Sequence, residues 1–192
     1  MCLKKTLSGT GQEKLPAVGF RIMLFMYWVY DLFFNSEKRI QSHLRAAGIT
    51  EGMTLVDYGC GPGRYTMYMS KLVGETGTVF ACDIHDMAMD KVWEKIRKHG
   101  LKNVKAVLVS GYSCPVDDHC ADVICALDMF HFIKDTKSFL GELHRIVKHE
   151  GLLVISEGHQ PRDEARQKIL DSGCWNIIAE DDDVMKCRPA DF

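Results

Sequence analysis

Short apolar runs alternate with longer amphipathic stretches along most of this 192-residue chain. The short runs lack a strict alternation of apolar and polar positions, which is typical of strands covered on both faces of a sheet. The longer stretches repeat apolar residues every three to four positions, which predicts helices with one buried face. Strands that alternate with such helices favour a parallel sheet of the α/β class.

The pattern places five parallel strands in the core of the sheet, with helices between most of them. The expected strands are Thr54–Tyr58, Thr78–Cys82, Val104–Val109, Val123–Leu127 and Leu152–Ser156. The expected helices are Arg64–Val73, Met87–His99, Thr136–Lys148 and Arg162–Asp171, followed by a hairpin of two strands, Trp175–Ala179 and Val184–Arg188. The connection "GYSCPVDDHCAD" is too short and too rich in turn residues for a long helix.

Two further helical segments, Val18–Phe34 and Ser36–Ala47, precede the first strand. The first is rich in aromatic residues, but Arg21 and Asp31 leave only nine uninterrupted apolar residues, whereas a membrane span needs about 20. We expect either a buried helix or a helix that covers a site, with attachment to a membrane surface as the alternative. The chain then divides into a tail with a helical cap, residues 1–48, and one structural unit, residues 49–192.

Composition excludes several classes of function. The net charge is −2 and no basic stripe is present, so nucleic acid is not an expected partner. The eight cysteines form no CxxC pair, which favours free thiols over a metal framework. The first residues, "MCLKKTLSGTGQEKLP", lack the apolar core of a secretion signal, so we expect a cytoplasmic protein.

The stretch "LVDYGCGPGRYT", residues 55–66, joins the first strand to the helix that follows it. Such a junction presents unpaired backbone N–H groups, and glycines allow a ligand to approach the backbone closely. The spacing is GxGxG, with Arg64 where the dinucleotide motif GxGxxG has its last glycine. Asp57 would repel a pyrophosphate and attract an ammonium or sulfonium group. The loop therefore points to a cationic cofactor.

At this point the chain resembles the class I S-adenosylmethionine-dependent methyltransferases, in particular the type 11 group and the ubiquinone and menaquinone C-methyltransferases. Four segments carry the resemblance in order: "DYGCGPG", "VFACDIHDMAM", "CPVDDHCADVICALDMFHFIKD" and "FLGELHRIVKHEGLLVISEG". The resemblance implies a Rossmann-like, mostly parallel sheet of seven strands, with helices on both faces and the last strand antiparallel. It also implies S-adenosylmethionine as the cofactor and methyl transfer as the activity.

The resemblance assigns cofactor-binding roles to one residue or group at the end of each strand. They are Asp57, Gly59, Cys60, Gly61 and Gly63 in the loop, Asp83 at the ribose with Ile84 beside it, Ser110, Gly111 and Tyr112 at the adenine, and Leu127 and Asp128 at the methionine end. Many family members carry an aspartate where this chain has Ser110. Either the serine accepts the adenine hydrogen bond, or backbone groups at Gly111 and Tyr112 read the base, with the Tyr112 ring against it.

The catalytic group is the least defined part of the prediction. Side chains after the fourth and fifth strands lie where the crevice should form, which selects Asp128, His131, Glu157 and His159. We name His131 as the catalytic candidate, with a structural role as the alternative. No metal is expected.

The expected acceptor is a small molecule, apolar or aromatic, because the N-terminal segment supplies so many aromatic side chains. Two other readings stay open: an NAD-dependent oxidoreductase, and a noncatalytic S-adenosylmethionine-binding protein of the same fold. The number of cysteines alone suggests an arsenic-methylating variant, but no thiol constellation supports it.

Overall fold

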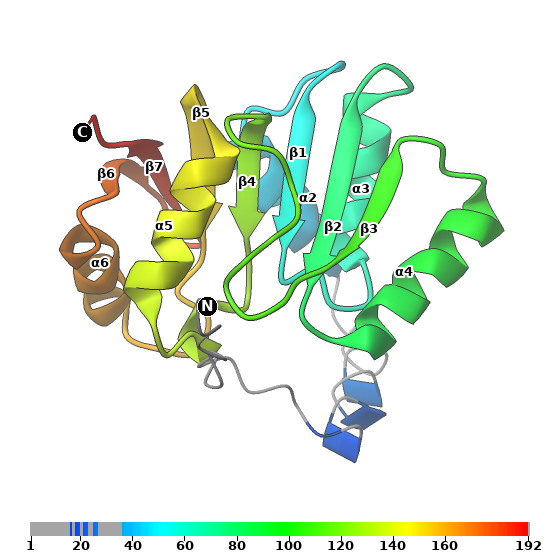
Figure 1. Cartoon of the computed structure of the whole chain (residues 1–192), viewed down its shortest axis with the longest axis horizontal. Coiled ribbons are helices and arrows are strands. Elements are labelled where there is room, and N and C mark those ends of the chain that lie inside the picture. The colour runs from blue at the N-terminus through cyan, green and yellow to red at the C-terminus, as the bar shows by residue number, and fades with distance from the viewer. Residues whose placement is uncertain (1–15, 17, 20, 23–24, 27–35, 192) are drawn as a thin grey trace, which may run out of the picture.

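The computed structural model describes residues 16, 18–19, 21–22, 25–26 and 36–191 of the chain. In this part of the chain, seven strands form one sheet in the order β3-β2-β1-β4-β5-β7-β6 (Figure 1). The strands are β1 (Thr54–Tyr58), β2 (Thr78–Asp83), β3 (Val104–Leu108), β4 (Ala121–Ala126), β5 (Val147–Ile155), β6 (Trp175–Glu180) and β7 (Met185–Pro189). Strands β1 to β5 pair in parallel, whereas β7 runs antiparallel to β5 and β6. The fold class predicted from the sequence is confirmed.

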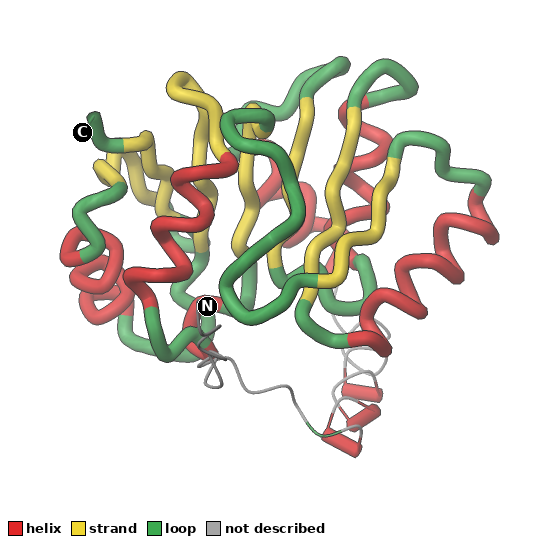
Figure 2. The backbone as a smooth tube through the Cα atoms, viewed as in Figure 1, coloured by secondary structure: helices red, strands yellow, loops and turns green. Residues whose placement is uncertain are grey.

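Helices cover both faces of the sheet (Figure 2). They are α2 (Ser36–Ala46), α3 (Arg64–Val73), α4 (Asp86–His99), α5 (Thr136–Ile146) and α6 (Arg162–Asp171), with a short 3₁₀ turn η1 (Phe130–Phe132) after β4. Apolar residues of α2, α3 and α4 share one buried cluster, and those of α5 and α6 share the other. This layering brings the loops after β1, β2, β3, β4 and β5 to one edge of the sheet.

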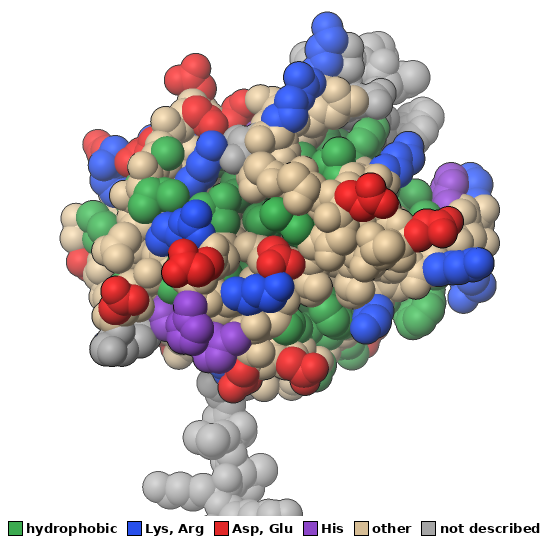
Figure 3. Space-filling model, turned by 90° about the horizontal axis from the view of Figure 1, so that it is seen from above, with side chains coloured by type: hydrophobic (Ala, Val, Ile, Leu, Met, Phe, Trp, Pro, Cys, Tyr) green, Lys and Arg blue, Asp and Glu red, His purple; other side chains and the backbone are tan. Residues whose placement is uncertain are grey.

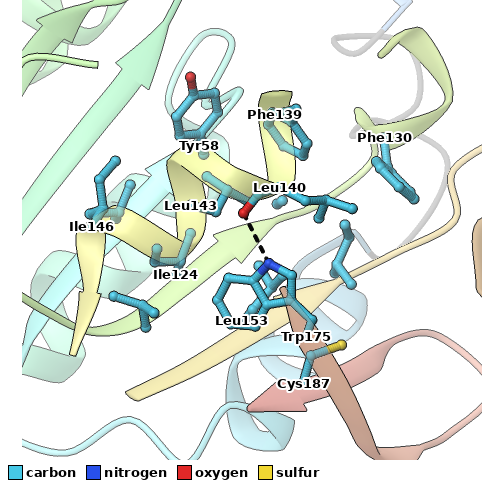
Figure 4. Packing of buried hydrophobic residues seen from close by; sticks show 14 of the residues in the cluster. Tyr58, Ile124, Phe130, Phe139, Leu140, Leu143, Ile146, Leu153, Trp175 and Cys187 are labelled. Atoms are coloured by element: carbon cyan, nitrogen blue, oxygen red, sulfur yellow. Dashed lines mark hydrogen bonds between the residues drawn. The ribbon is translucent and has the colours of Figure 1, made fainter. Parts of the chain in front are cut away.

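The cluster under α5 fixes the end of β1 (Figure 4). Tyr58, the last residue of β1, meets Phe139 edge-on, with ring centroids 5.4 Å apart. On the other side of α5, Trp175 Nε1 donates a hydrogen bond to the Leu140 carbonyl oxygen at 3.0 Å. Complete burial of one such side chain contributes about 1.5–3 kcal/mol, so this packing holds the strand whose end carries the glycine loop.

The connection between β3 and β4 is an extended loop, as expected, and it crosses the sheet face (Figure 1). No helix connects β3 to β4 in the part of the chain that the structure describes, and two charged residues of α5 hold this loop in place. Glu142 Oε1 accepts from the Cys114 backbone N–H at 2.7 Å. Arg145 donates to the carbonyl oxygens of Cys114 and Val116, at 2.9 Å each. Cys114 and Val116 are buried, so the loop forms part of the core.

Two adjoining boundary predictions were wrong. The helix expected to run to Lys148 ends at Ile146, and β5, expected to begin at Leu152, begins at Val147. The reason is a pairing distant in sequence: Val147 lies opposite Ala121 of β4, and the register shifts between Ala121 and Val123. The polar residues Lys148 and Glu150, which look like a helix end, therefore lie in a strand.

The predicted helix 18–34 falls largely outside the described residues. Those described, 18–19, 21–22 and 25–26, are helical. Val18, Ile22, Phe25 and Met26 are between 54% and 68% exposed. Among the described residues no helix is long and apolar enough to cross a membrane.

The described surface carries charges of both signs. On the face seen in Figure 3, basic and acidic side chains are interspersed and neither sign dominates. The seven described cysteines are free thiols. No group of three or more potential metal ligands gathers among the residues that the structure describes.

Candidate active site

The loop between β1 and α3 is built from three glycines in a left-handed conformation. Gly59, Gly61 and Gly63 have φ angles of 76°, 51° and 74°. The backbone N–H groups of Gly59 and Cys60 donate to the Cys82 carbonyl oxygen, at 2.8 and 3.1 Å. The loop is therefore anchored to the end of β2.

The three glycines serve different purposes. A Cβ atom at Gly59 would lie 2.7 Å from Met129 Cγ, and one at Gly63 would lie 3.2 Å from Val92 Cγ2. At Gly61 a Cβ atom would meet nothing within 4 Å. Gly59 and Gly63 thus allow close packing inside the protein, whereas Gly61 presents bare backbone to open space, where a ligand can approach it.

The carboxylate of Asp83 lies against this loop. Its Oδ2 accepts from the Gly61 N–H at 2.9 Å, and its Oδ1 accepts from the His85 N–H at 2.8 Å. Burial raises the pKa of Asp83, and these two backbone hydrogen bonds oppose the rise. The acid that ends β2 and the glycine loop that follows β1 therefore form one unit.

Asp57 belongs to β1, two residues before the first glycine of the loop, and is only 2% exposed. Thr66 Oγ1 donates to its Oδ2 at 2.5 Å. Burial raises the pKa of Asp57 to about 7, the charge of Asp83 adds to the rise, and the hydrogen bond from Thr66 opposes it. The charge of Lys95 also opposes the rise, although the burial of Asp57 outweighs it. A bound cation would therefore stabilise its ionised form.

Asp128 follows β4 and is held from two sides. Its backbone N–H donates to Ser156 Oγ at 2.7 Å, and its Oδ2 accepts from the Tyr65 hydroxyl at 3.2 Å. Its φ angle of 59° is uncommon for a residue other than glycine. Met129, the next residue, packs against Gly59, so the end of β4 lies beside the glycine loop.

The segment after β3 forms a tight turn at the same edge. Backbone groups of Ser110 and Ser113 exchange hydrogen bonds of 3.2 and 3.0 Å, and Gly111 has a φ angle of 60°. The Tyr112 hydroxyl accepts from the Asp135 N–H at 3.0 Å, and its ring packs against the core. Val109 N–H donates to the Asp83 carbonyl oxygen at 2.8 Å, which ties this turn to the end of β2.

His131 lies in η1, against the backbone of Gly158. A Cβ atom at Gly158 would lie 2.1 Å from His131 Nδ1, so only glycine fits there. The His159 ring meets His131 edge-on at 4.8 Å. Within the described part of the chain neither ring nitrogen of His131 has a hydrogen-bond partner. Burial lowers the pKa of His131, and the neighbouring His159 lowers it further.

A family model described as a methyltransferase domain matches residues 56–155, which run from β1 to the end of β5. The chain belongs to the methyltransferase domain family. The family predicted from the sequence is confirmed. The matched region contains every candidate residue from Asp57 to His131, whereas Glu157 and His159 lie beyond it.

Curated proteins similar to this methyltransferase domain are also described as methyltransferases. The ubiquinone/menaquinone biosynthesis C-methyltransferase of Citrobacter koseri is 31% identical over 133 residues, which is 69% of this chain and 53% of the relative. The protein of the same description from Klebsiella pneumoniae has the same identity and coverage. The chain spans about half the length of these curated relatives.

Solved structures share the fold. An S-adenosylmethionine-dependent methyltransferase from Aquifex aeolicus superposes with a TM-score of 0.71 at 28% identity, over 79% of this chain and 89% of that one. A TehB-like S-adenosylmethionine-dependent methyltransferase from Corynebacterium glutamicum reaches a TM-score of 0.68 at 16% identity, over 91% and 100% of the two chains. At that identity the second likeness concerns the fold alone.

In this methyltransferase domain the predicted site residues meet at one edge of the sheet. The loop from Asp57 to Gly63 contacts Asp83, and the turn at Ser110 adjoins Asp83 through Val109. Ile84, which follows Asp83, is partly buried, and Leu127, which precedes Asp128, is buried. Glu157, one of the proposed bases, forms an ion pair instead: Arg162 Nη2 lies 3.0 Å from its Oε2. Its carboxylate is therefore neutralised within the protein.

Sequence reasoning missed four side chains that orient the acids of the site. They are His43, Tyr65, Thr66 and Ser156. Thr66 lies three residues after the last glycine of the loop, so its position in the first turn of α3 could have suggested a contact with Asp57. His43 and Ser156 are far from their partners in sequence and give no such signal.

Proposed function

We propose that this chain transfers the methyl group of S-adenosylmethionine to a small acceptor. One observation carries the proposal: the bare backbone of Gly61 faces open space, and its N–H is held by the carboxylate of Asp83, while a second acid, Asp57, lies in the strand just before the loop. A cationic ligand fits such a place, and a pyrophosphate does not. Membership of the methyltransferase domain family supports the same cofactor.

Each part of the cofactor has a proposed partner. The loop Gly59–Gly63, with Cys60 in it, takes the amino-acid end, together with Asp57, Leu127 and Asp128. Asp83 accepts hydrogen bonds from the two ribose hydroxyls, beside Ile84, and gives up its bond to the Gly61 N–H as it does so. Ser110 and the backbone of Gly111 and Tyr112 face the adenine. Because the Tyr112 hydroxyl is tied to Asp135, its ring has a fixed place at this turn.

When bound, the cofactor supplies a methyl group already activated by its sulfonium, so the protein must mainly align the acceptor and exclude water. His131 is the proposed group at the acceptor. The lowered pKa keeps its imidazole neutral near pH 7, and its ring nitrogens have no hydrogen-bond partner among the described residues. Both nitrogens are buried, so an acceptor hydroxyl that gives His131 a proton or a hydrogen bond must enter the space beside the ring.

The proposed acceptor carries an aromatic or quinol-like ring. The curated relatives are described as acting in ubiquinone and menaquinone biosynthesis. Phe132, next to His131, is 61% exposed, which offers an apolar contact near the proposed acceptor group. We further propose that residues 18–34 cover this side of the site, and that the protein works in the cytoplasm with peripheral contact to a membrane when the acceptor is lipophilic.

The other two readings are weaker. The spacing GxGxG and the family match disfavour an NAD-dependent oxidoreductase. A noncatalytic protein of the same fold would bind S-adenosylmethionine without ever forming S-adenosylhomocysteine.

The test is a screen of quinols, phenols, small amines and thiols with S-adenosylhomocysteine release as the readout. We expect release with at least one ring-containing acceptor, and a large loss of release in a His131→Ala variant that still binds S-adenosylmethionine. A His131→Ala variant as active as the parent would reject His131 as the catalytic group. If the protein binds the cofactor and no acceptor class gives release, the noncatalytic reading holds instead.

A further inference from the structure

A line of hydrogen-bonded side chains runs from helix α2 to Asp128. His43 Nδ1 lies 2.9 Å from the Tyr65 hydroxyl oxygen, and that hydroxyl lies 3.2 Å from Asp128 Oδ2. His43 is fully buried and Tyr65 is 8% exposed, and their rings stack with centroids 5.8 Å apart. The three residues come from α2, from the first turn of α3 and from the end of β4, so the line connects separate parts of the fold.

The chemistry of the groups fixes the direction of these bonds. An ionised carboxylate only accepts, so the single hydroxyl proton of Tyr65 points to Asp128. The Tyr65 oxygen then accepts from His43 Nδ1–H. Both donors therefore point toward Asp128, and in a buried line each bond strengthens the next. Such a line stabilises negative charge at its end and fixes the carboxylate in place.

We infer that Tyr65 and His43 are positioning residues that hold the Asp128 carboxylate for the ammonium group at the amino-acid end of the cofactor. This inference rests on the proposed function. The left-handed backbone at Asp128 supports it, because strained residues that the surroundings hold in place cluster at ligand sites. The packing of Met129 on Gly59 supports it too, because it puts Asp128 beside the glycine loop.

The far end of the line faces an acid. His43 Nε2 lies 3.7 Å from Asp183 Oδ1, in the turn between β6 and β7. Asp181 of the same turn accepts from the backbone N–H groups of Asp183 and Val184, at 2.9 Å each, which holds that turn in shape. A neutral His43 that donates from Nδ1 would turn the lone pair of Nε2 toward this carboxylate, so the arrangement fits the protonated imidazole, whose Nε2–H faces the turn and whose Nδ1–H faces Tyr65. Helix α2 therefore belongs to the cofactor site rather than only to the cap.

The first test separates positioning from simple bracing by the choice of ligand. S-adenosylhomocysteine carries the amino-acid end, whereas methylthioadenosine lacks it and keeps the adenosine. Tyr65→Phe removes the hydroxyl and keeps the ring that stacks on His43. We expect its affinity for S-adenosylhomocysteine to fall about tenfold, or 1.4 kcal/mol, while its affinity for methylthioadenosine stays within about twofold of the parent. Calorimetry measures both.

The second test uses a matched pair of variants at His43. An asparagine amide can place an N–H near the position of Nδ1, and a glutamine amide can place one near Nε2. We expect His43→Asn to keep most of the affinity for S-adenosylhomocysteine and His43→Gln to lose it, with methylthioadenosine binding unchanged in both. If neither His43 variant folds, as judged by thermal melting, the Tyr65→Phe comparison still decides.

The outcomes separate this inference from the proposed function. Equal losses for both ligands, or no loss for either, in Tyr65→Phe would overturn the positioning role and leave the proposed function intact. If the unaltered chain binds neither ligand, the proposed function fails, and the inference fails with it.

Discussion

Lowering the pH from 7 to 5 should weaken the binding of S-adenosylmethionine about fiftyfold through Asp57 alone. The pKa of Asp57 in the free protein is raised to about 7 by burial. The cationic cofactor binds best to the ionised carboxylate, so binding must remove a proton wherever Asp57 is protonated. Affinity should therefore fall as the pH falls below 7.

The magnitude follows from the ionised fraction. With a pKa of about 7, half of the Asp57 carboxyl groups are ionised at pH 7 and about one in a hundred at pH 5, a ratio of about 50 or ~2.3 kcal/mol. The ligand itself contributes little, because an α-amino group with a pKa of about 7.7–8.0 stays protonated throughout this window.

Isothermal titration calorimetry measures both the affinity and the proton. In two buffers of different ionisation enthalpy, we expect Asp57 to release about 0.9 protons per cofactor bound at pH 6 and about 0.5 at pH 7. Asp57→Asn is the matched control, because its amide oxygen can still accept from Thr66. It should bind more weakly at pH 7 and show no pH dependence below it.

Two results would refute the reasoning. One is an affinity that stays constant between pH 7 and pH 5 in the unaltered protein. The other is the same pH dependence in Asp57→Asn, which would assign the proton to another group, with Asp83 the first to consider because its pKa is also raised.

Four further predictions concern the same site. Asp83→Ala should cost on the order of 1.5–3 kcal/mol of cofactor affinity by calorimetry, because hydrogen bonds to a charged group are lost; unchanged affinity would reject the ribose assignment. Gly61→Ala and Gly100→Ala both force a methyl onto a left-handed backbone with open space around it, so each should lower the free energy of unfolding by roughly 1 kcal/mol. Only Gly61→Ala should lower cofactor affinity, and equal affinities in the two variants would contradict the role of the loop. Chelators should leave methyl transfer unchanged, and restoration of lost activity by a divalent ion would point to Asp128 and Glu157 as ligands. Deletion of residues 1–34 should keep cofactor affinity within about tenfold, 1.4 kcal/mol, and abolish transfer to the native acceptor. Equal transfer by the truncated chain would mean that the segment has a structural role only.

The sheet and the glycine loop were predictable because their signals are local. Each strand is a compact apolar run, and the three glycines lie within five positions. The turn after β3 was predictable for the same reason. By contrast, the start of β5 at Val147 depends on pairing with Ala121, 26 residues earlier in the chain. A local sequence pattern does not report contacts between residues so far apart, so the polar residues after Ile146 were predicted to extend the helix.

The acids of the site could be named from the sequence, but their surroundings could not. Asp57 and Asp83 stand at recognisable positions at or near strand ends, whereas the buried His43 lies 22 residues before its partner Tyr65. The pairing of Glu157 with Arg162 was also not foreseen, although five residues separate them. The structure thus adds the partners that decide charge and orientation, which depend on how α2, α3 and β5 pack together.

The most direct test of the account is a calorimetric titration of the intact chain with S-adenosylmethionine, with NADH as the comparison ligand, at pH 7.5. We expect saturable binding of one S-adenosylmethionine per chain, lost or weakened in Asp83→Ala, and no binding of NADH. Binding of NADH with no heat from S-adenosylmethionine would contradict the assignment of the glycine loop and of the site built around it.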